Sequence, residues 1–172
     1  MGVVNANAQD IFKKGSFVGN VGIGFGNLSW GGDGSYGGES SAAFQVSGEY
    51  GIMDNLINGN NGSIGVGAVI GYGGKSWDYV KLNNVLVGAL GSFHYQFIPK
   101  LDTYGTLTLG LNFQNWKWDG DEFWGGDNKE SNVAFQPEIH VGARYYFTNN
   151  FAAMAEVGYG LSIFSVGISY KF

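Results

Sequence analysis

The stretch VLVGALGSFHYQF, residues 85–97, decides the fold class of this chain. Its odd-numbered positions are apolar or aromatic apart from one glycine, whereas its even-numbered positions carry Leu, Gly, Ser, His and Gln. A period of two indicates a β-strand whose two faces meet different surroundings. A tilted strand of about this length is also long enough to cross a lipid bilayer.

The same alternation recurs in seven further segments, and we find no convincing helical stripe between them. These segments are residues 17–25, 44–50, 64–72, 106–114, 133–147, 151–159 and 164–172. No residue on their apolar tracks is charged, as expected if a Lys or Arg facing lipid costs roughly 2–4 kcal/mol at the bilayer midplane. We therefore predict an all-β protein, an eight-stranded antiparallel up-and-down transmembrane β-barrel.

Composition excludes several other classes of protein. Only 13% of the residues are charged, against about a quarter in ordinary soluble domains. The net charge of −5, with no basic cluster beyond Lys13-Lys14, argues against nucleic-acid binding. The chain has no cysteine, so disulfides and thiolate chemistry are excluded. The sequence contains no run of 18 consecutive apolar residues, so no transmembrane helix is predicted.

Alternation alone does not say which face points outward, but side-chain size does. The apolar track is large and branched, and the other track is rich in Gly, Ser and Ala, which suits the narrow interior of an eight-stranded barrel. Aromatic residues also gather toward both ends of the strands, as in the two aromatic girdles of a membrane barrel. We therefore expect the apolar track to face lipid.

The N-terminus predicts the end of a secretory signal. Ala6-Asn7-Ala8 fits a small-residue cleavage site, with Gln9 as the first mature residue. We therefore interpret residues 1–8 as a signal-peptide remnant and residues 9–172 as a single barrel domain.

The last strand carries a more specific resemblance. The ending VGISYKF, residues 166–172, alternates and closes on an aromatic residue. It resembles the C-terminal signature of bacterial outer-membrane proteins, and the chain as a whole is similar to the small OmpA-like and OmpX-like barrels. The resemblance implies a bacterial outer-membrane location and insertion by the barrel-insertion machinery, with Tyr170 and Phe172 as the insertion signal. It also implies contact with outer-membrane lipid and lipopolysaccharide.

Connections of unequal length predict the orientation. Periplasmic turns are expected at 53–62, 98–103 and 148–150, and extracellular loops at 30–40, 74–81, 115–131 and 160–163, with both termini periplasmic. Pro137 falls inside a strand, where a closed barrel has no free edge. We therefore expect a bulge or a missing ladder bond there.

Polar residues on the inward track predict an interior network, formed by Glu49, His94, Glu138, His140, Arg144 and Glu156. Pairing across the 148–150 turn places Glu156 opposite Gly142, within diagonal reach of Arg144 and His140. Charges kept from water must be paired or hydrogen-bonded, so a structural role is favoured over a gated ion or proton path.

Ser92 and His94 share the inward face, and a hydrolase would need a nucleophile, a base and an orienting acid in contact. Some small outer-membrane barrels are lipid A deacylases with a His-x-Ser arrangement, but Ser92-Phe93-His94 has the reverse order. We expect no catalytic residue and no cofactor.

The segment 116–127 is the most distinctive loop because it is both acidic and rich in tryptophan. The five Trp residues lie in or beside predicted outer loops: Trp30, Trp77, Trp116, Trp118 and Trp124. They are interpreted first as the outer aromatic girdle and a loop cap, and alternatively as candidate extracellular contacts for a protein or glycan partner. The acidic positions Asp119, Asp121, Glu122 and Asp127 do not match an EF-hand, so no metal site is predicted.

Three functions follow from these features. The first is a non-enzymatic membrane protein, structural or adhesive, that acts through its outer loops, alone or as an accessory subunit with outer-membrane protein partners. The second is a narrow pore, which large inward residues such as Leu86 and Leu90 oppose. The third is a lipid A-modifying enzyme.

Overall fold

The structure is a computed structural model that describes residues 11–26, 39–40, 42–57, 61–77, 80–118 and 129–172. At 39–40, 75–77, 80–82, 116–118 and 129–130 it describes the backbone alone. Its strands are β1 (Phe17–Phe25), β2 (Glu39–Ser40), β3 (Ala43–Leu56), β4 (Gly62–Trp77), β5 (Val80–Ile98), β6 (Leu101–Trp118), β7 (Lys129–Tyr146), β8 (Phe151–Tyr159) and β9 (Phe164–Lys171). No helix in this part of the chain is long and apolar enough to cross a membrane.

Eight of the strands close into one antiparallel barrel, as predicted. Each long strand pairs with the next along the chain, and β1 pairs with both β3 and β9. The two-residue strand β2 is added to the edge of β4, where Glu39 lies opposite Ser76. The fold is therefore an up-and-down barrel, and the eight-strand prediction is confirmed.

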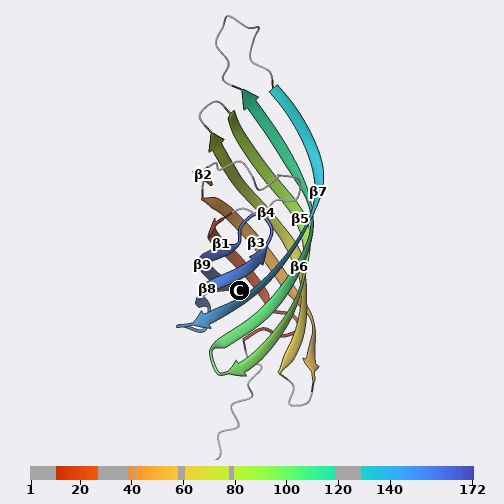
Figure 1. The fold of residues 1–172 in the computed structure, drawn as a ribbon. Helices are drawn as coiled ribbons and strands as arrows, with labels where there is room; N and C mark the ends of the chain where they lie inside the picture. Colours follow the sequence, from red (N-terminus) through yellow and green to blue (C-terminus); the bar gives the residue numbers. More distant parts are fainter. Residues whose placement is uncertain (1–10, 27–38, 41, 58–60, 78–79, 119–128) are drawn as a thin grey trace, which may run out of the picture.

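The two ends of the barrel differ (Figure 1). One end, here called the turn end, holds the connections β3–β4, β5–β6 and β7–β8 and the C-terminus. At the other end β4, β5, β6 and β7 continue well past β1, β8 and β9. We call this the projecting end, and the extended parts of β4 to β7 the projecting sheet.

The projecting sheet corrects the predicted loops. The described residues of the predicted loops 74–81 and 115–131 belong to the sheet, because β4 runs to Trp77, β5 starts at Val80, β6 runs to Trp118 and β7 starts at Lys129. Within 30–40, residues 39–40 form β2. Hydrogen bonding to the neighbouring strand continues there although the apolar alternation has ended, so periodicity placed the strand ends too early.

The turn end also differs from the prediction. Instead of a turn over 53–62, β3 continues to Leu56 through register shifts on either side of Met53, and Asn55 and Ile57 have positive φ angles of 58° and 68°. These bulges explain the unusual length of this connection. The expected turn at 98–103 is only Pro99 and Lys100, so β6 begins at Leu101.

Pro137 lies on a strand edge rather than in a bulge. The β6–β7 register passes through Leu109 and Pro137 without a shift, and the β7–β8 pairing ends at Ile139 and Tyr159. Among the described residues, the segment 131–138 of β7 therefore has no partner on its β8 side. A proline is tolerated at such an edge because no ladder bond needs its missing N–H.

Candidate functional site

The predicted interior residues all lie inside the barrel and are buried. Their exposed fractions are 8% or less: Glu49, His94, Glu138, His140, Arg144 and Glu156. They form two groups, one near the turn end around Arg144 and one toward the projecting end around Glu138.

The group near the turn end is an ion cluster of four side chains. Arg144 donates to Glu49 through Nη2 and to Asp102 Oδ2 through Nη1, the latter at 3.2 Å. His94 lies between the same two acids, with Nδ1 3.0 Å from Asp102 and Nε2 3.0 Å from Glu49. Carboxylates only accept hydrogen bonds, so both ring nitrogens must donate and His94 is cationic. The four charges then sum to zero.

Asp102 was missed in the sequence because it falls in the predicted turn. The tight Pro99-Lys100 turn, with a φ of 69° at Lys100, lets β6 start at Leu101, before the end of the predicted turn. This puts Asp102 in register with Arg144 on β7. Alternation then turns its side chain inward, where it is 2% exposed. The available signal was the inward alternation of residues 106–114, which places position 102 on the inward track when it is continued backward.

Glu156 does not bind Arg144 directly. It lies opposite Gly142 as predicted, but it accepts hydrogen bonds from Tyr104 Oη at 2.8 Å and from Ser165 Oγ at 3.1 Å. The Arg144 guanidinium carbon lies 4.1 Å from the centre of the Tyr104 ring. Tyr104 therefore fills the space between the two charges, a position that sequence reasoning did not assign to it.

The chain itself closes the turn end of the barrel. Ahead of β1, Phe12 stacks on His94 with ring centroids 3.8 Å apart, and its carbonyl accepts a hydrogen bond from Ser63 Oγ at 3.0 Å. Ile11 packs against Tyr146 and Ala152 in the same layer. Residues 11 and 12 thus cover the ion cluster on the side of the turn end.

A second closure lies toward the projecting end. The β8–β9 connection, predicted as an outer hairpin, folds inward so that Leu161 packs against Leu86 and Ala43 and is 1% exposed. Glu138 Oε1 accepts from the Leu161 backbone N–H at 2.5 Å and from Gln136 Nε2 at 3.1 Å. A buried carboxylate therefore holds this inward hairpin in place.

We expect Glu138→Ala to destabilise the barrel by about 1–3 kcal/mol, because it leaves the buried Leu161 N–H without its acceptor. The free energy of unfolding, measured in urea with lipid vesicles, tests this. Glu138→Gln is the matched control, since it keeps an acceptor oxygen and should lose clearly less. Equal losses in the two variants would contradict a role as acceptor.

Little free space remains between the two closures. The cavity there has a volume of about 20 Å³ and is bordered by residues of both groups, including Glu49, His140, Arg144 and Glu156. That is room for about one water molecule. Around this cavity the described side chains of the two groups fill most of the interior.

Ser92, His94 and Asp102 have the contacts of a catalytic triad. Ser92 Oγ is 3.0 Å from His94 Nε2, and Nδ1 faces Asp102. However, Ser92 Oγ donates to Glu49 Oε2 at 2.7 Å, and a Cβ atom on Gly65 would meet both Ser92 Oγ and the Phe12 ring. Ser92, His94 and Asp102 are therefore closely packed and form part of the buried hydrogen-bond network around Arg144.

The other candidate positions are only partly described. Trp77 lies in β4, and Trp116 and Trp118 lie in β6, paired with Leu82 and Val80; Trp30, Trp124 and the acidic positions of the 116–127 segment lie outside the described residues. Within the described part, no cluster of His, Asp and Glu has the arrangement of a metal site.

At the C-terminus, Tyr170 and Phe172 belong to an aromatic row on the outer surface. The ring of Tyr170 lies 5.3 Å from Phe151 and 4.9 Å from Phe172, and Phe172 also contacts Phe17. These side chains form part of the girdle at the turn end.

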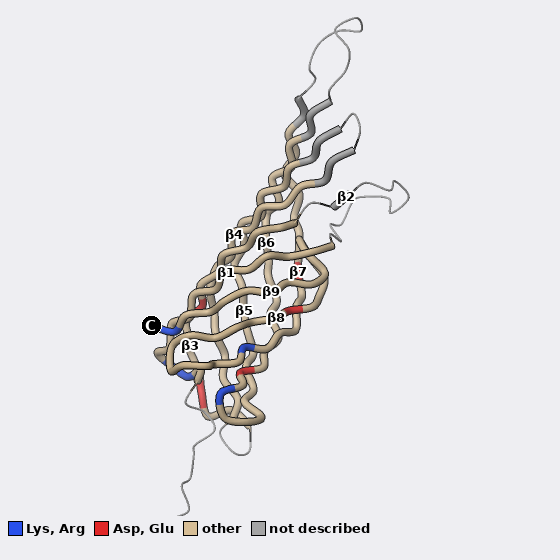
Figure 2. Tube along the Cα trace, turned by 90° about the vertical axis from the view of Figure 1, so that its left-hand side faces the viewer, with Lys and Arg blue, Asp and Glu red and all other residues tan. Residues whose placement is uncertain are grey.

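The described outer surface is apolar from the turn end to the base of the projecting sheet. Large apolar side chains point outward there. Examples are Val21, Ile70 and Val141, which are 53%, 59% and 62% exposed. Figure 2 shows few charged residues along the barrel wall. An apolar exterior around a polar, hydrogen-bonded interior defines a transmembrane β-barrel.

Comparison with solved structures shows that the chain has the fold of small outer-membrane barrels. It is similar to the N-terminal β-barrel domain of Pseudomonas aeruginosa OprF, with 18% identity, a TM-score of 0.52, and coverage of 93% of this chain and 98% of that one. It is also similar to Ail, the attachment invasion locus protein of Yersinia pestis, with 14% identity, a TM-score of 0.57, and coverage of 92% and 99%. The chain thus has the OmpA-like and OmpX-like eight-stranded fold. No protein-family model and no curated protein sequence matches it.

Proposed function

We propose that this protein is an integral outer-membrane barrel without catalytic activity that binds partners outside the cell through its projecting end. In this orientation the termini and short turns are periplasmic, and the loops of the projecting end are extracellular. The protein acts as a structural or adhesion module, either alone or as an accessory subunit with outer-membrane protein partners.

The projecting sheet is the observation that carries this proposal. The strands β4 to β7 have 16 to 19 residues, whereas β1, β8 and β9 have 8 or 9. A strand of 9–11 residues is enough to cross the bilayer, so the additional residues are free to act outside it. The unpaired edge of β7 at 131–138 adds backbone groups that a partner strand can pair with.

The filled interior supports the absence of transport and catalysis. Residues 11–12 and the 160–163 hairpin close the two ends, and the ion cluster fills the space near the turn end. The narrow-pore alternative and the lipid A-modifying alternative both need space or access that this interior does not offer.

The similar structures favour adhesion over a purely structural role. Ail is named as an attachment protein, and a further Ail structure, with a TM-score of 0.54, 14% identity and coverage of 91% of this chain and 99% of that one, was solved with a heparin analogue. The 116–127 segment of this chain is acidic, which disfavours a sulfated ligand of that kind and favours a neutral or basic partner.

Biogenesis and membrane contact complete the proposal. Tyr170 and Phe172 lie at the end of the last strand, in the pattern that the barrel-insertion machinery recognises in bacterial outer-membrane proteins. The apolar exterior contacts outer-membrane lipid and lipopolysaccharide. Cleavage after residue 8 remains a prediction, because residues 1–10 lie outside the described part of the chain.

Deleting residues 116–127 should abolish adhesion and leave the barrel intact. The deletion joins Asn115 to Asn128, and because Asn115 pairs with Ser131, it leaves a three-residue loop of the kind that closes natural hairpins. Cells expressing the variant would be tested for attachment to surfaces coated with extracellular proteins and neutral glycans.

Gly91→Leu, which changes only the membrane-facing wall, is the matched control. A folded deletion variant, verified by its heat-modifiable gel mobility, that adheres as well as the control would refute the proposed role of this segment.

A further inference from the structure

A broad groove crosses the outer wall of the barrel over β5 to β9. Its volume is about 620 Å³. One wall is aromatic and consists of Phe93, Tyr95 and Phe97, with the last two rings 4.7 Å apart edge to face. Val157 and Phe164 form the opposite wall. The groove faces the bilayer, since these side chains belong to the outward track.

The floor of the groove consists of small residues on three neighbouring strands. Thr103 and Gly105 on β6 lie opposite Ala143 and Val141 on β7, and Ala143 lies opposite Ala155 on β8. The Thr103 hydroxyl donates to the Tyr95 carbonyl, so its hydrogen-bonding capacity is used within the wall. The floor is therefore apolar, and its small residues make it lower than the two walls.

Packing within the chain does not require glycine at position 105. A Cβ atom there would meet nothing closer than the His140 carbonyl oxygen at 3.9 Å. By contrast, Cβ atoms on the outward-facing Gly19 and Gly48 would contact the rings of Phe172 and Phe17, which cover them. Gly105 therefore keeps the floor of the groove low, and a side chain at this position would fill the groove without a clash inside the chain.

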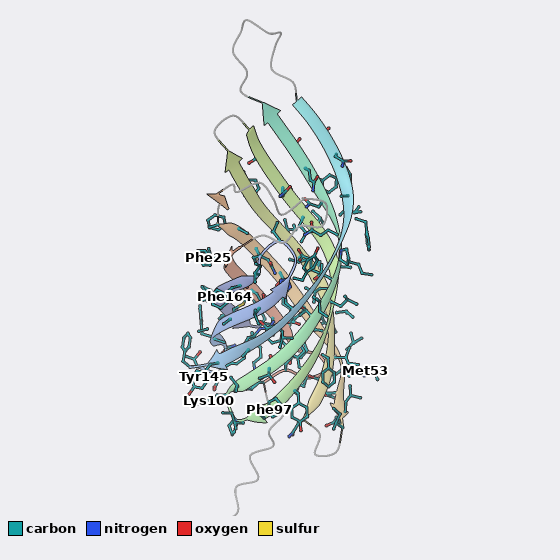
Figure 3. The ribbon with its side chains drawn as sticks, in the orientation of Figure 1. Phe25, Met53, Phe97, Lys100, Tyr145 and Phe164 are labelled. Atoms are coloured by element: carbon teal, nitrogen blue, oxygen red, sulfur yellow. The ribbon has the colours of Figure 1, made fainter. Side chains whose placement is uncertain are left out.

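The groove runs from the turn end toward the middle of the wall. Phe97 lies at the turn end and Phe164 higher up the barrel, and Lys100 lies beside Phe97 in the β5–β6 turn (Figure 3). Lys100 is exposed, and its ammonium group forms no ion pair with any residue in the described part of the chain. An apolar groove with a cation at its interfacial end matches an acyl chain attached to an anionic headgroup.

We propose that this groove binds one acyl chain of an anionic glycerophospholipid, with the phosphate near Lys100. This inference rests on the membrane orientation proposed above, which puts the turn end in the periplasmic leaflet. It is independent of the adhesion proposal, because no groove residue lies in the projecting sheet.

The test uses the full chain purified in a mild detergent, with phosphatidylglycerol or phosphatidylcholine of identical acyl chains added. Native mass spectrometry then counts the bound lipids. We expect the wild-type chain to retain phosphatidylglycerol preferentially and Gly105→Leu to lose most of it, because the new side chain fills the floor. Ala143→Leu is a second filling variant, in case the first one folds poorly.

The chain offers a closely matched control in Gly91→Leu. Gly91 is also outward and exposed, a Cβ atom on it would meet nothing within 4 Å, and it does not line the groove. This control should retain lipid as the wild-type chain does. Lipid retention that is equal in Gly105→Leu, Ala143→Leu and Gly91→Leu would overturn the proposal.

Lys100→Gln tests the headgroup, with Lys14→Gln as the control at the same end of the barrel. Lys100→Gln should remove the preference for phosphatidylglycerol, and Lys14→Gln should retain it. Equal retention of the two lipids by the wild-type chain would refute the anionic headgroup. A dimer that Gly105→Leu dissociates would show that a second copy of the chain occupies the groove instead.

Discussion

Arg144→Met is expected to destabilise the folded barrel by about 3–5 kcal/mol, the cost of removing one partner from a buried ion pair. Glu49 and Asp102 are each 2% exposed or less, so neither carboxylate gains water when the guanidinium is removed. The remaining charges, two carboxylates and the His94 imidazolium, sum to −1 inside the barrel. Urea unfolding of the protein in lipid vesicles would measure the loss.

A compensating variant separates charge balance from the loss of packing. Arg144→Met combined with Glu49→Gln leaves Asp102 and His94 as a neutral pair, so it should recover a substantial part of the lost stability. A double variant as unstable as the single one would show that the shape of Arg144, including its contact with Tyr104, matters more than its charge.

Val21→Arg should cost about 2–4 kcal/mol, the range for a basic side chain on the lipid face at the bilayer midplane. Val21 is 53% exposed, lies midway between Phe17 and Phe25 on β1, and has Val46 and Ile168 as its cross-strand neighbours. The free energy of unfolding in vesicles is again the measurement.

Thr148→Arg is the control for depth in the membrane. Thr148 is exposed in the β7–β8 turn, and the cost of arginine falls to about 0–1 kcal/mol near the interface. Similar costs at positions 21 and 148 would mean that lipid does not cover the middle of the outer wall.

The strands and their outward faces were predictable because they depend on local alternation. In residues 85–97 each outward side chain meets lipid and each inward one meets a narrow interior, and both constraints repeat every two residues. Where lipid no longer covers the wall, as in the projecting sheet, the apolar alternation ends although the strands continue. The predicted loops there were therefore wrong.

The candidate site was predictable only as a set of inward residues. Glu49 and Arg144 are 95 positions apart in the chain, and their contact exists because β1 closes the barrel between β3 and β9. Asp102 and Tyr104 were missed because the turn has two residues and not the predicted six, so β6 already starts at Leu101 and contains both. The partner of Arg144 thus followed from closure and register, which no local pattern encodes.

By itself, the sequence determined that apolar and small or polar residues alternate, that eight strands form the barrel and which of their faces meets lipid. The reason is that the two faces of a membrane-crossing strand have different surroundings, which imposes a period of two. Only the tertiary structure decided how the interior is closed. Ile11 and Leu161 lie in short segments without periodicity, and they enter the barrel because its wall provides apolar partners: Tyr146 and Ala152 for Ile11, and Leu86 and Ala43 for Leu161. Such contacts arise between distant segments and form only once the barrel has closed.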